Sequence, residues 1–83
     1  MLDTWFRHLA LKNPSLLVEG AGGWLVPITP TETIADLAAR LSLPVIVVVA
    51  NRLGCINHTL LTLESIRARG LHCPGIILNN LPA

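Results

Sequence analysis

The segment Pro44–Ala50, PVIVVVA, constrains the fold of this chain more than any other stretch. It is continuously apolar and rich in β-branched residues, without the alternation typical of a strand that has one face in water. Such a run predicts a strand covered on both faces, as in parallel sheets. Because parallel strands are joined by long crossovers, usually helices, the flanking sequence has to supply helices.

The flanking sequence shows this alternation of elements. Helical spacing of apolar residues predicts a first helix over residues 1–11, which ends at Asn13-Pro14. Leu16–Val18 is expected to form a short strand, and residues 24–28 an extended piece that Pro27 keeps out of the middle of a sheet. A second helix, with Thr31 or Thr33 as its cap, has one apolar face made of Ile34, Leu37, Ala38 and Leu41.

The C-terminal half predicts one more helix and one more strand. The helix is expected from about Asn57 to Arg69, and it ends at Gly70, a typical left-handed stop. Its inward face is expected to contain Ile56, Leu60, Leu63 and Ile66. Gly75–Asn79 is the last expected strand. The order of elements predicts an α/β fold, a parallel sheet with helices on both faces.

Length and composition suggest that this unit is incomplete. The chain has 83 residues, of which 52% are hydrophobic and 13% charged. So short a chain leaves much of its surface in water, and a three-stranded parallel sheet has two unpaired edges. We therefore expect residues 1–83 to form a single, partial α/β domain that meets another segment or subunit.

Charge and cysteine content exclude several classes of function. The net charge is +1 and the six basic residues are scattered, which argues against binding to nucleic acid or to an anionic membrane. The longest apolar run is too short to span a bilayer. Cys55 and Cys73 lie far apart and form no zinc motif with the histidines, so we expect two reduced thiols in a cytoplasmic protein.

Candidate site residues follow the three expected strands, where open α/β sheets bind ligands. Glu19 and the glycines after it follow the first strand, residues 51–57 the second, and Asn79-Asn80 the third. We expect these ends to lie along one rim. Glu19 with Gly20, Ala21 and Gly22 suits either a tight turn or an anion site whose carboxylate binds magnesium.

Two phosphate-binding motifs are excluded at these glycines. The dinucleotide fingerprint needs Gly or Ala where Leu25 stands, and no Gly-Lys-Ser/Thr occurs anywhere in the chain. The only lysine, Lys12, precedes a proline turn and reads as a surface residue.

The helix start at Leu53, Gly54, Cys55 and Asn57 offers free N–H groups to a carboxylate or phosphate, although Asn57 is also a plausible helix cap. No base is placed beside Cys55, which favours an inert thiol. Asn79 suits either the edge of a nucleotide base or a turn.

Taken together, VEGAGGWLVPIT, LPVIVVVANRLGCINHTLLTLESIRARGL and GIILNN resemble the dethiobiotin synthetase family of biotin biosynthesis. The resemblance implies a doubly wound, P-loop NTPase-like domain. It also implies ATP- and Mg²⁺-dependent conversion of diaminopelargonic acid and carbon dioxide to dethiobiotin, by a homodimer.

The resemblance also assigns roles to individual residues. By resemblance, Glu19 binds Mg²⁺ and, with Gly20, Ala21 and Gly22, the nucleotide phosphates. The substrate carboxylate is implied at Leu53, Gly54, Cys55 and Asn57, near a dimer interface, and Asn79 is implied to contact the adenine.

The chain departs from this family in one respect. The family begins with a phosphate loop that contains lysine and threonine, and none of this precedes Leu16. We therefore expect the catalytic lysines to lie outside this chain, in a missing N-terminal half, and the isolated chain to be inactive. The alternatives are a non-catalytic remnant or interaction module, and a related P-loop amidoligase or partition ATPase.

Overall fold

The computed structural model describes residues 2–13, 15–20 and 22–80. It divides the chain into two compact units, residues 1–41 and 42–83, each of which is described by itself below. The first contains helices α1 (Leu2–Lys12) and α2 (Ile34–Leu41). The second contains strand β1 (Ile46–Ala50), helix α3 (Cys55–Ala68) and strand β2 (Gly75–Asn79).

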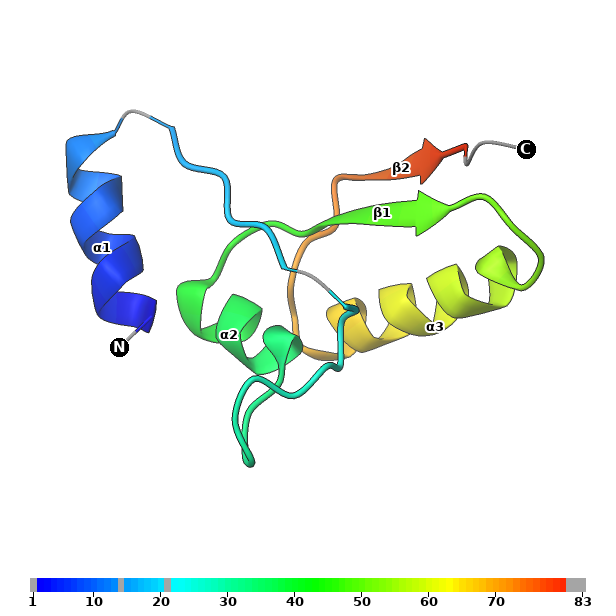
Figure 1. Cartoon of the computed structure of the whole chain (residues 1–83), viewed down its shortest axis with the longest axis horizontal. Helices are drawn as coiled ribbons and strands as arrows, with labels where there is room; N and C mark the ends of the chain where they lie inside the picture. Colours follow the sequence, from blue (N-terminus) through cyan, green and yellow to red (C-terminus); the bar gives the residue numbers. More distant parts are fainter. Residues whose placement is uncertain (1, 14, 21, 81–83) are drawn as a thin grey trace. The chain divides into compact units, whose positions relative to one another are not determined.

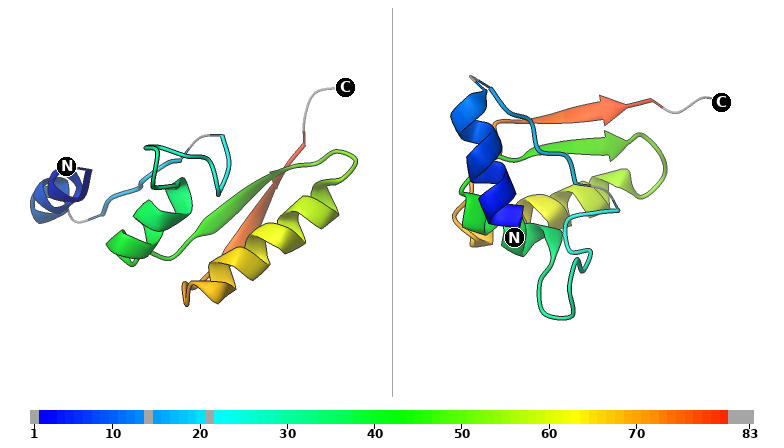
Figure 2. Two further views of the ribbon diagram at one scale, coloured as in Figure 1. Left: turned by 90° about the horizontal axis from the view of Figure 1, so that it is seen from below. Right: turned by 60° about the vertical axis from the view of Figure 1, so that its left-hand side comes forward.

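The second unit is a β1–α3–β2 segment with parallel strands (Figure 1). Ile46 pairs with Gly75 at one end of the ladder, and Ala50 with Asn79 at the other. Figure 2 shows α3 running alongside the two strands as the crossover between them. The predicted α/β class, with parallel strands joined by a helix, is confirmed.

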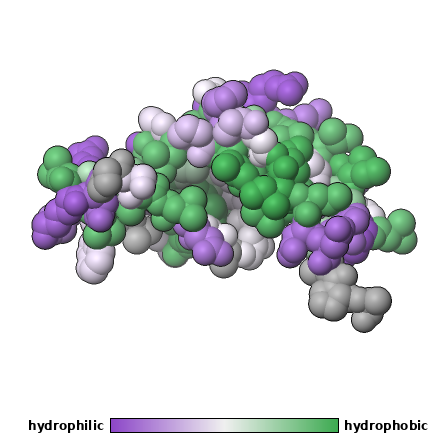
Figure 3. Space-filling view, turned by 90° about the horizontal axis from the view of Figure 1, so that it is seen from above, coloured by the Kyte–Doolittle hydropathy of each residue, from purple (hydrophilic) through white to green (hydrophobic). Residues whose placement is uncertain are grey.

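The core of this unit lies between α3 and β1. Ile66 of α3 is 1% exposed and Val49 of β1 is 8% exposed. On the opposite face, Ile46, Val48 and Ile77 stay more than half exposed, and Figure 3 shows apolar side chains gathered on that side. Within residues 42–80, α3 covers one face of the strand, so the predicted cover on the second face is not provided by this unit itself.

Helix α3 begins two residues earlier than expected and ends where expected. Gly70 has a φ of +71°. Its N–H donates to the Arg67 carbonyl, and the N–H of Leu71 donates to the Ile66 carbonyl, which is the Schellman pattern. Ile56 and Leu60 line a groove together with Val49 and Leu78 of the strands, as their expected inward positions require, but both side chains stay mostly exposed. Among the described residues the sheet has two strands, and the groove, of about 240 Å³, stays open beside these side chains.

In the first unit, reciprocal hydrogen bonds define the start of α2. The Asp36 N–H donates to Thr33 Oγ1 at 3.2 Å, and the Thr33 N–H donates to Asp36 Oδ2 at 2.8 Å. This is a capping box, so Thr33 is the cap rather than Thr31. Ala35, in the first turn of α2, is fully buried.

Helix α1 confirms the predicted first helix, and the Asn13 side chain donates to the Leu9 carbonyl at its end. Arg40 of α2 makes a two-pronged ion pair with Asp3 of α1, through Nε to Oδ2 at 3.0 Å and Nη2 to Oδ1 at 2.8 Å. It also pairs with Glu32. The hydrogen bond from Arg40 lowers the pKa of Asp3 below its ordinary value of 3.8.

The strand expected at residues 16–18 is wrong. This segment is irregular and Leu17 is 88% exposed. A strand exists only where a neighbour completes its ladder, and the described residues offer this segment no such neighbour. The expected three-stranded sheet is thus a two-stranded one within the part of the chain that the structure describes.

Within residues 2–13, 15–20 and 22–80, no helix combines the length and the apolar character needed to cross a bilayer.

Candidate functional site

The polar ends of β1 and β2 lie together in the second unit. The Asn51 N–H, directly after β1, donates to the Asn79 carbonyl at 2.9 Å. The Asn51 side-chain Nδ2 donates to Asn80 Oδ1 at 2.7 Å. Two of the three predicted strand ends are therefore joined by hydrogen bonds at one edge of the sheet, with the Asn79 side chain exposed there.

A short turn leads from Asn51 into α3. The Arg52 N–H donates to the Ala50 carbonyl at 2.9 Å, and the Cys55 N–H donates to the Arg52 carbonyl at 3.0 Å. Gly54 is the N-cap residue with a φ of +92°, a left-handed conformation that residues with a side chain rarely adopt. The Leu53 side chain is fully exposed. The turn thus brings Leu53, Gly54 and Cys55 directly beside the end of β1.

The start of α3 has the donors that an anion needs. No side chain caps this helix, and the N–H groups of Ile56 and Asn57 have no acceptor among the described residues. Asn57 is the third residue of α3, so the alternative in which Asn57 caps the helix is wrong. With no acidic residue in the first turn, these N–H groups and the positive end of the helix dipole favour a carboxylate or phosphate.

Glu19 and the glycines belong to the first unit. Glu19 is exposed and lies in an irregular segment, and Ala21 lies outside the described residues. A Cβ atom on Gly20 would come within 3.1 Å of the Ile34 side chain, so the backbone passes close to the first residue of α2. Gly22 and Gly23 have φ values of +91° and +125°, which glycine alone adopts without strain.

The segment after the glycines is held against the start of α2. The Trp24 carbonyl accepts a hydrogen bond from the Ala35 N–H at 2.9 Å, and the Val26 carbonyl accepts one from the Ile34 N–H at 3.0 Å. The first amides of α2 are therefore occupied by the chain itself. Any anion bound at the glycines has to use other N–H groups.

The described residues can supply one ligand of a magnesium site, but not a full set of protein ligands. They contain no cluster of three or more His, Cys, Asp or Glu side chains arranged to hold a metal. Magnesium is often held by one or two carboxylates together with water and nucleotide phosphates. Glu19 is exposed and makes no ion pair with any residue that the structure describes, which suits the part of a single carboxylate in such a site.

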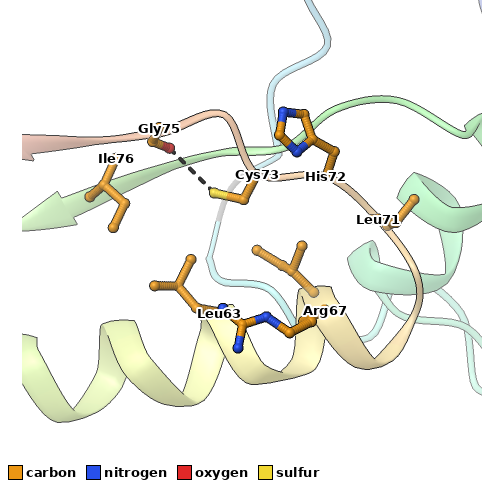
Figure 4. A pocket seen from close by; sticks show the side chains of 8 residues that line it. Leu63, Arg67, Leu71, His72, Cys73, Gly75 and Ile76 are labelled. Carbon is orange, nitrogen blue, oxygen red and sulfur yellow. Dashed lines mark hydrogen bonds between the residues drawn. The ribbon is translucent and has the colours of Figure 1, made fainter.

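A separate cavity of about 420 Å³ lies between the C-terminal part of α3 and the segment that leads into β2 (Figure 4). It is lined by apolar side chains together with Arg67, His72 and Cys73, and the Cys73 thiol donates to the Gly75 carbonyl at 3.4 Å. Gly75 begins β2 and Asn79 ends it, so this cavity lies at the strand end remote from the candidate site.

The structure therefore groups five of the predicted site residues in one unit, namely Leu53, Gly54, Cys55, Asn57 and Asn79. Glu19, Gly20 and Gly22 lie in the other unit, and their expected place on the same rim stays a prediction. The bond between Asn51 and Asn80 is not predicted by any sequence motif. Its only signal in the sequence is an amide side chain after each of two neighbouring strands.

Comparisons with known proteins agree with this α/β arrangement. The sequence matches the family described as "AAA domain" over residues 1–83. It is 51% identical to the ATP-dependent dethiobiotin synthetase BioD of Akkermansia muciniphila over 92% of this chain and 36% of the relative. It is 61% identical to the same enzyme of Cellvibrio japonicus, over 81% of this chain and 29% of the relative.

A more distant relative extends the match to nearly the whole chain. The dethiobiotin synthetase of Photobacterium profundum is 42% identical over 98% of this chain and 37% of its own length. The chain thus spans about a third of the length of the curated relatives it matches. The chain therefore belongs to the AAA-domain family and is a partial homologue of the dethiobiotin synthetases.

Proposed function

We propose that this chain supplies part of the active site of a dethiobiotin synthetase, the part that binds the substrate carboxylate and the adenine of ATP. The observation that carries this proposal is the joining of the two polar strand ends by Asn51, beside an uncapped start of α3. The relatives are named as ATP-dependent dethiobiotin synthetases, and such an enzyme has to bind ATP close to the substrate that it converts.

The geometry of the second unit suits binding of a carboxylate at the start of α3 and of adenine at the end of β2. The free N–H groups of Ile56 and Asn57 would bind the carboxylate of diaminopelargonic acid, with Leu53 and Gly54 beside it. The Asn79 amide would donate to and accept from the adenine edge. Binding of both substrates at one sheet edge would hold their reacting groups together, and positioning is the main source of catalysis in phosphoryl transfer.

We assign to Glu19 the carboxylate that holds Mg²⁺ beside the nucleotide phosphates, with Gly20, Ala21 and Gly22 close to them. When bound, the ion would neutralise charge on the transferring phosphoryl group. In the proposed reaction one amine of diaminopelargonic acid adds to carbon dioxide and forms a carbamate. The γ-phosphate of ATP is transferred to the carbamate, and the second amine closes the ring as phosphate leaves.

The chain contains no Gly-Lys-Ser/Thr sequence, and its only lysine is Lys12, at the end of α1. We therefore propose that turnover needs the catalytic lysines of a complementary N-terminal portion, with homodimer formation, and that the chain alone has none. We place the reaction in the cytoplasm, where thiols such as Cys55 and Cys73 stay reduced.

The test combines binding and activity. Titration of the isotopically labelled chain with diaminopelargonic acid should shift the amide resonances of Ile56 and Asn57, and titration with ADP should shift those of Asn79. Leu61, exposed on α3 outside the site, provides the control position. Mixing with a separately made N-terminal portion of a relative should then give ATP-dependent dethiobiotin formation.

Each outcome separates the candidate functions. Dethiobiotin formation by the 83-residue chain alone would overturn its predicted inactivity. Association with the N-terminal portion without activity would favour a non-catalytic interaction module, for which the exposed apolar side chains on β1 are the supporting observation. An active complex that fails to bind diaminopelargonic acid would favour a related amidoligase or partition ATPase.

A further inference from the structure

Asn51, directly after β1, adds two hydrogen bonds to the contact between the ends of β1 and β2. Its backbone N–H donates to the Asn79 carbonyl at 2.9 Å, and its side-chain Nδ2 donates to Asn80 Oδ1 at 2.7 Å. One residue thus contacts two successive residues of the neighbouring strand end. The backbone bond alone continues the ladder, whereas the side-chain bond fixes the residue beyond it.

The same residue begins the turn that leads to α3. Three residues separate Asn51 from Cys55, the first residue of the helix. Hydrogen bonds from Arg52 to Ala50 and from Cys55 to Arg52 leave this turn little freedom. A shift of Asn51 relative to β2 would therefore be passed on to Gly54 and to the free N–H groups at the start of α3.

We propose that Asn51 is a positioning residue, which holds the Asn79 strand end and the Leu53–Asn57 loop in one fixed arrangement. The inference rests on the proposed function for its consequence, because those two segments are the proposed adenine and substrate-carboxylate sites. Asn51 touches neither ligand and acts through Asn79 and the turn. Without it, each site would form but their spacing would vary.

The chemistry of an amide pair allows a matched series of variants. If either residue becomes aspartate, the remaining asparagine still donates one hydrogen bond to the new carboxylate, so Asn51→Asp and Asn80→Asp each keep the contact. The double variant N51D/N80D has two carboxylates and no donor, and it loses the bond without a change in side-chain size. The control N51D/N13D adds the same charge, but Asn13 lies at the end of α1 in the other unit.

The first measurement is amide hydrogen exchange of the full 83-residue chain without ligand. We expect the N–H groups of Asn51 and Cys55 to keep their protection in both single variants and in N51D/N13D. In N51D/N80D their exchange should rise roughly fivefold or more, as expected for the loss of one hydrogen bond. The N–H of Gly70, bonded at the far end of α3, serves as the internal reference for global unfolding.

Three results would overturn the proposal. They are fast exchange of the Asn51 N–H in the wild-type chain, a double variant equal to the sum of its single variants, and a double variant equal to N51D/N13D. None of these needs turnover. If reconstitution with the N-terminal portion fails, the proposed function is wrong while the exchange data still decide whether Asn51 joins the two strand ends.

In the reconstituted enzyme, N51D/N80D should raise KM for both ATP and diaminopelargonic acid several-fold relative to Asn80→Asp, with kcat changed less. A residue with a purely structural role would lower the fraction of active enzyme, and hence the apparent kcat, at unchanged KM. That second pattern would count against positioning.

Discussion

At the scale of single residues, the turn before α3 depends on the backbone of Gly54. Its φ of +92° lies in the left-handed region, and a Cβ atom there would meet the His58 ring no closer than 3.7 Å. Space is therefore available and the conformation alone restricts the position. The same turn carries the proposed carboxylate site, so its shape sets the direction in which the free N–H groups of α3 point.

We predict that Gly54→Ala destabilises the chain by about 1 kcal/mol, because alanine is strained at positive φ. Gly54→Asn should cost less, since asparagine tolerates this region better. Urea-induced unfolding followed by circular dichroism measures the effect. Gly75→Ala is the matched control, because Gly75 does not have a positive φ and a Cβ atom added there would meet nothing within 4 Å. Equal effects at both positions would contradict the argument.

At the scale of elements, the start of α2 is fixed by a side chain that the sequence alone did not single out. Thr31 and Thr33 were both candidate caps, and the structure gives the capping box to Thr33 and Asp36. The Thr33 hydroxyl also contacts the Asp36 carboxylate at 3.1 Å. Because the first amides of α2 bond to Trp24 and Val26, this cap also holds the segment that follows the glycines.

We predict that Thr33→Ala lowers the stability of the first unit by about 1 kcal/mol, the usual cost of a lost N-cap. Thr31→Ala should have almost no effect, because only the backbone N–H of Thr31 makes a hydrogen bond to a described residue, the Thr29 hydroxyl. The measurement is the free energy of unfolding reported by amide exchange within α2. A larger loss in Thr31→Ala would mean that the helix begins elsewhere.

The ion pair between α1 and α2 makes the contact between these helices sensitive to acid. The Arg40 hydrogen bond lowers the pKa of Asp3 below 3.8. A carboxyl group with a lowered pKa in the folded state stabilises the fold above its unfolded pKa, and this contribution is lost as pH falls through the folded value. The contact should therefore be intact near neutral pH and weaken below about pH 4.

We predict that acidification below about pH 4 loosens the contact of α1 with Arg40 in the wild-type chain. In Asp3→Asn this contact should already be loose at neutral pH, and a further decrease in pH should change it less. Chemical shifts of the Arg40 Nε–H against pH provide the measurement, and added salt should weaken the exposed pair. Glu64→Gln, at an exposed position of α3, is the control. An unchanged pH profile in Asp3→Asn would show that Asp3 does not govern the contact.

At the scale of the whole molecule, the sequence predicted most helices and strands correctly, but not which elements pair or pack with one another. The β-branched run gave β1, and Gly75–Asn79 and the Gly70 stop matched the structure, because each depends on local residues. A strand at residues 16–18 and the burial of Ile56 depend on neighbouring elements that the described residues do not provide. The bond between Asn51 and Asn80 depends on the register of β1 and β2, which no local pattern encodes.

The candidate site divides in the same way. Residues on the turn after β1 and at the end of β2 were brought together as predicted, because parallel strands end at one edge. The position of Glu19 relative to that edge depends on how two units are joined, which no local pattern sets. Its role therefore stays a prediction, tested by the reconstituted complex.

The two faces of β1 give the last prediction. Val48 is 63% exposed on the face away from α3, whereas Val49 is 8% exposed against it. Parallel sheets are normally covered on both faces, and the matched part makes up only 36% and 33% of two of the relatives. We therefore expect this apolar face of the second unit to bind a further apolar surface.

Val48→Thr should lower binding of a hydrophobic dye and self-association, with little change in the free energy of unfolding. Val49→Thr places a hydroxyl in the core and should destabilise the chain by about 1–3 kcal/mol, with no decrease in dye binding. Addition of the N-terminal portion should reduce dye binding by the wild-type chain, since the covering segment would displace the dye. If both substitutions destabilise equally, the exposed face is already covered within these 83 residues, and the argument for a missing partner fails.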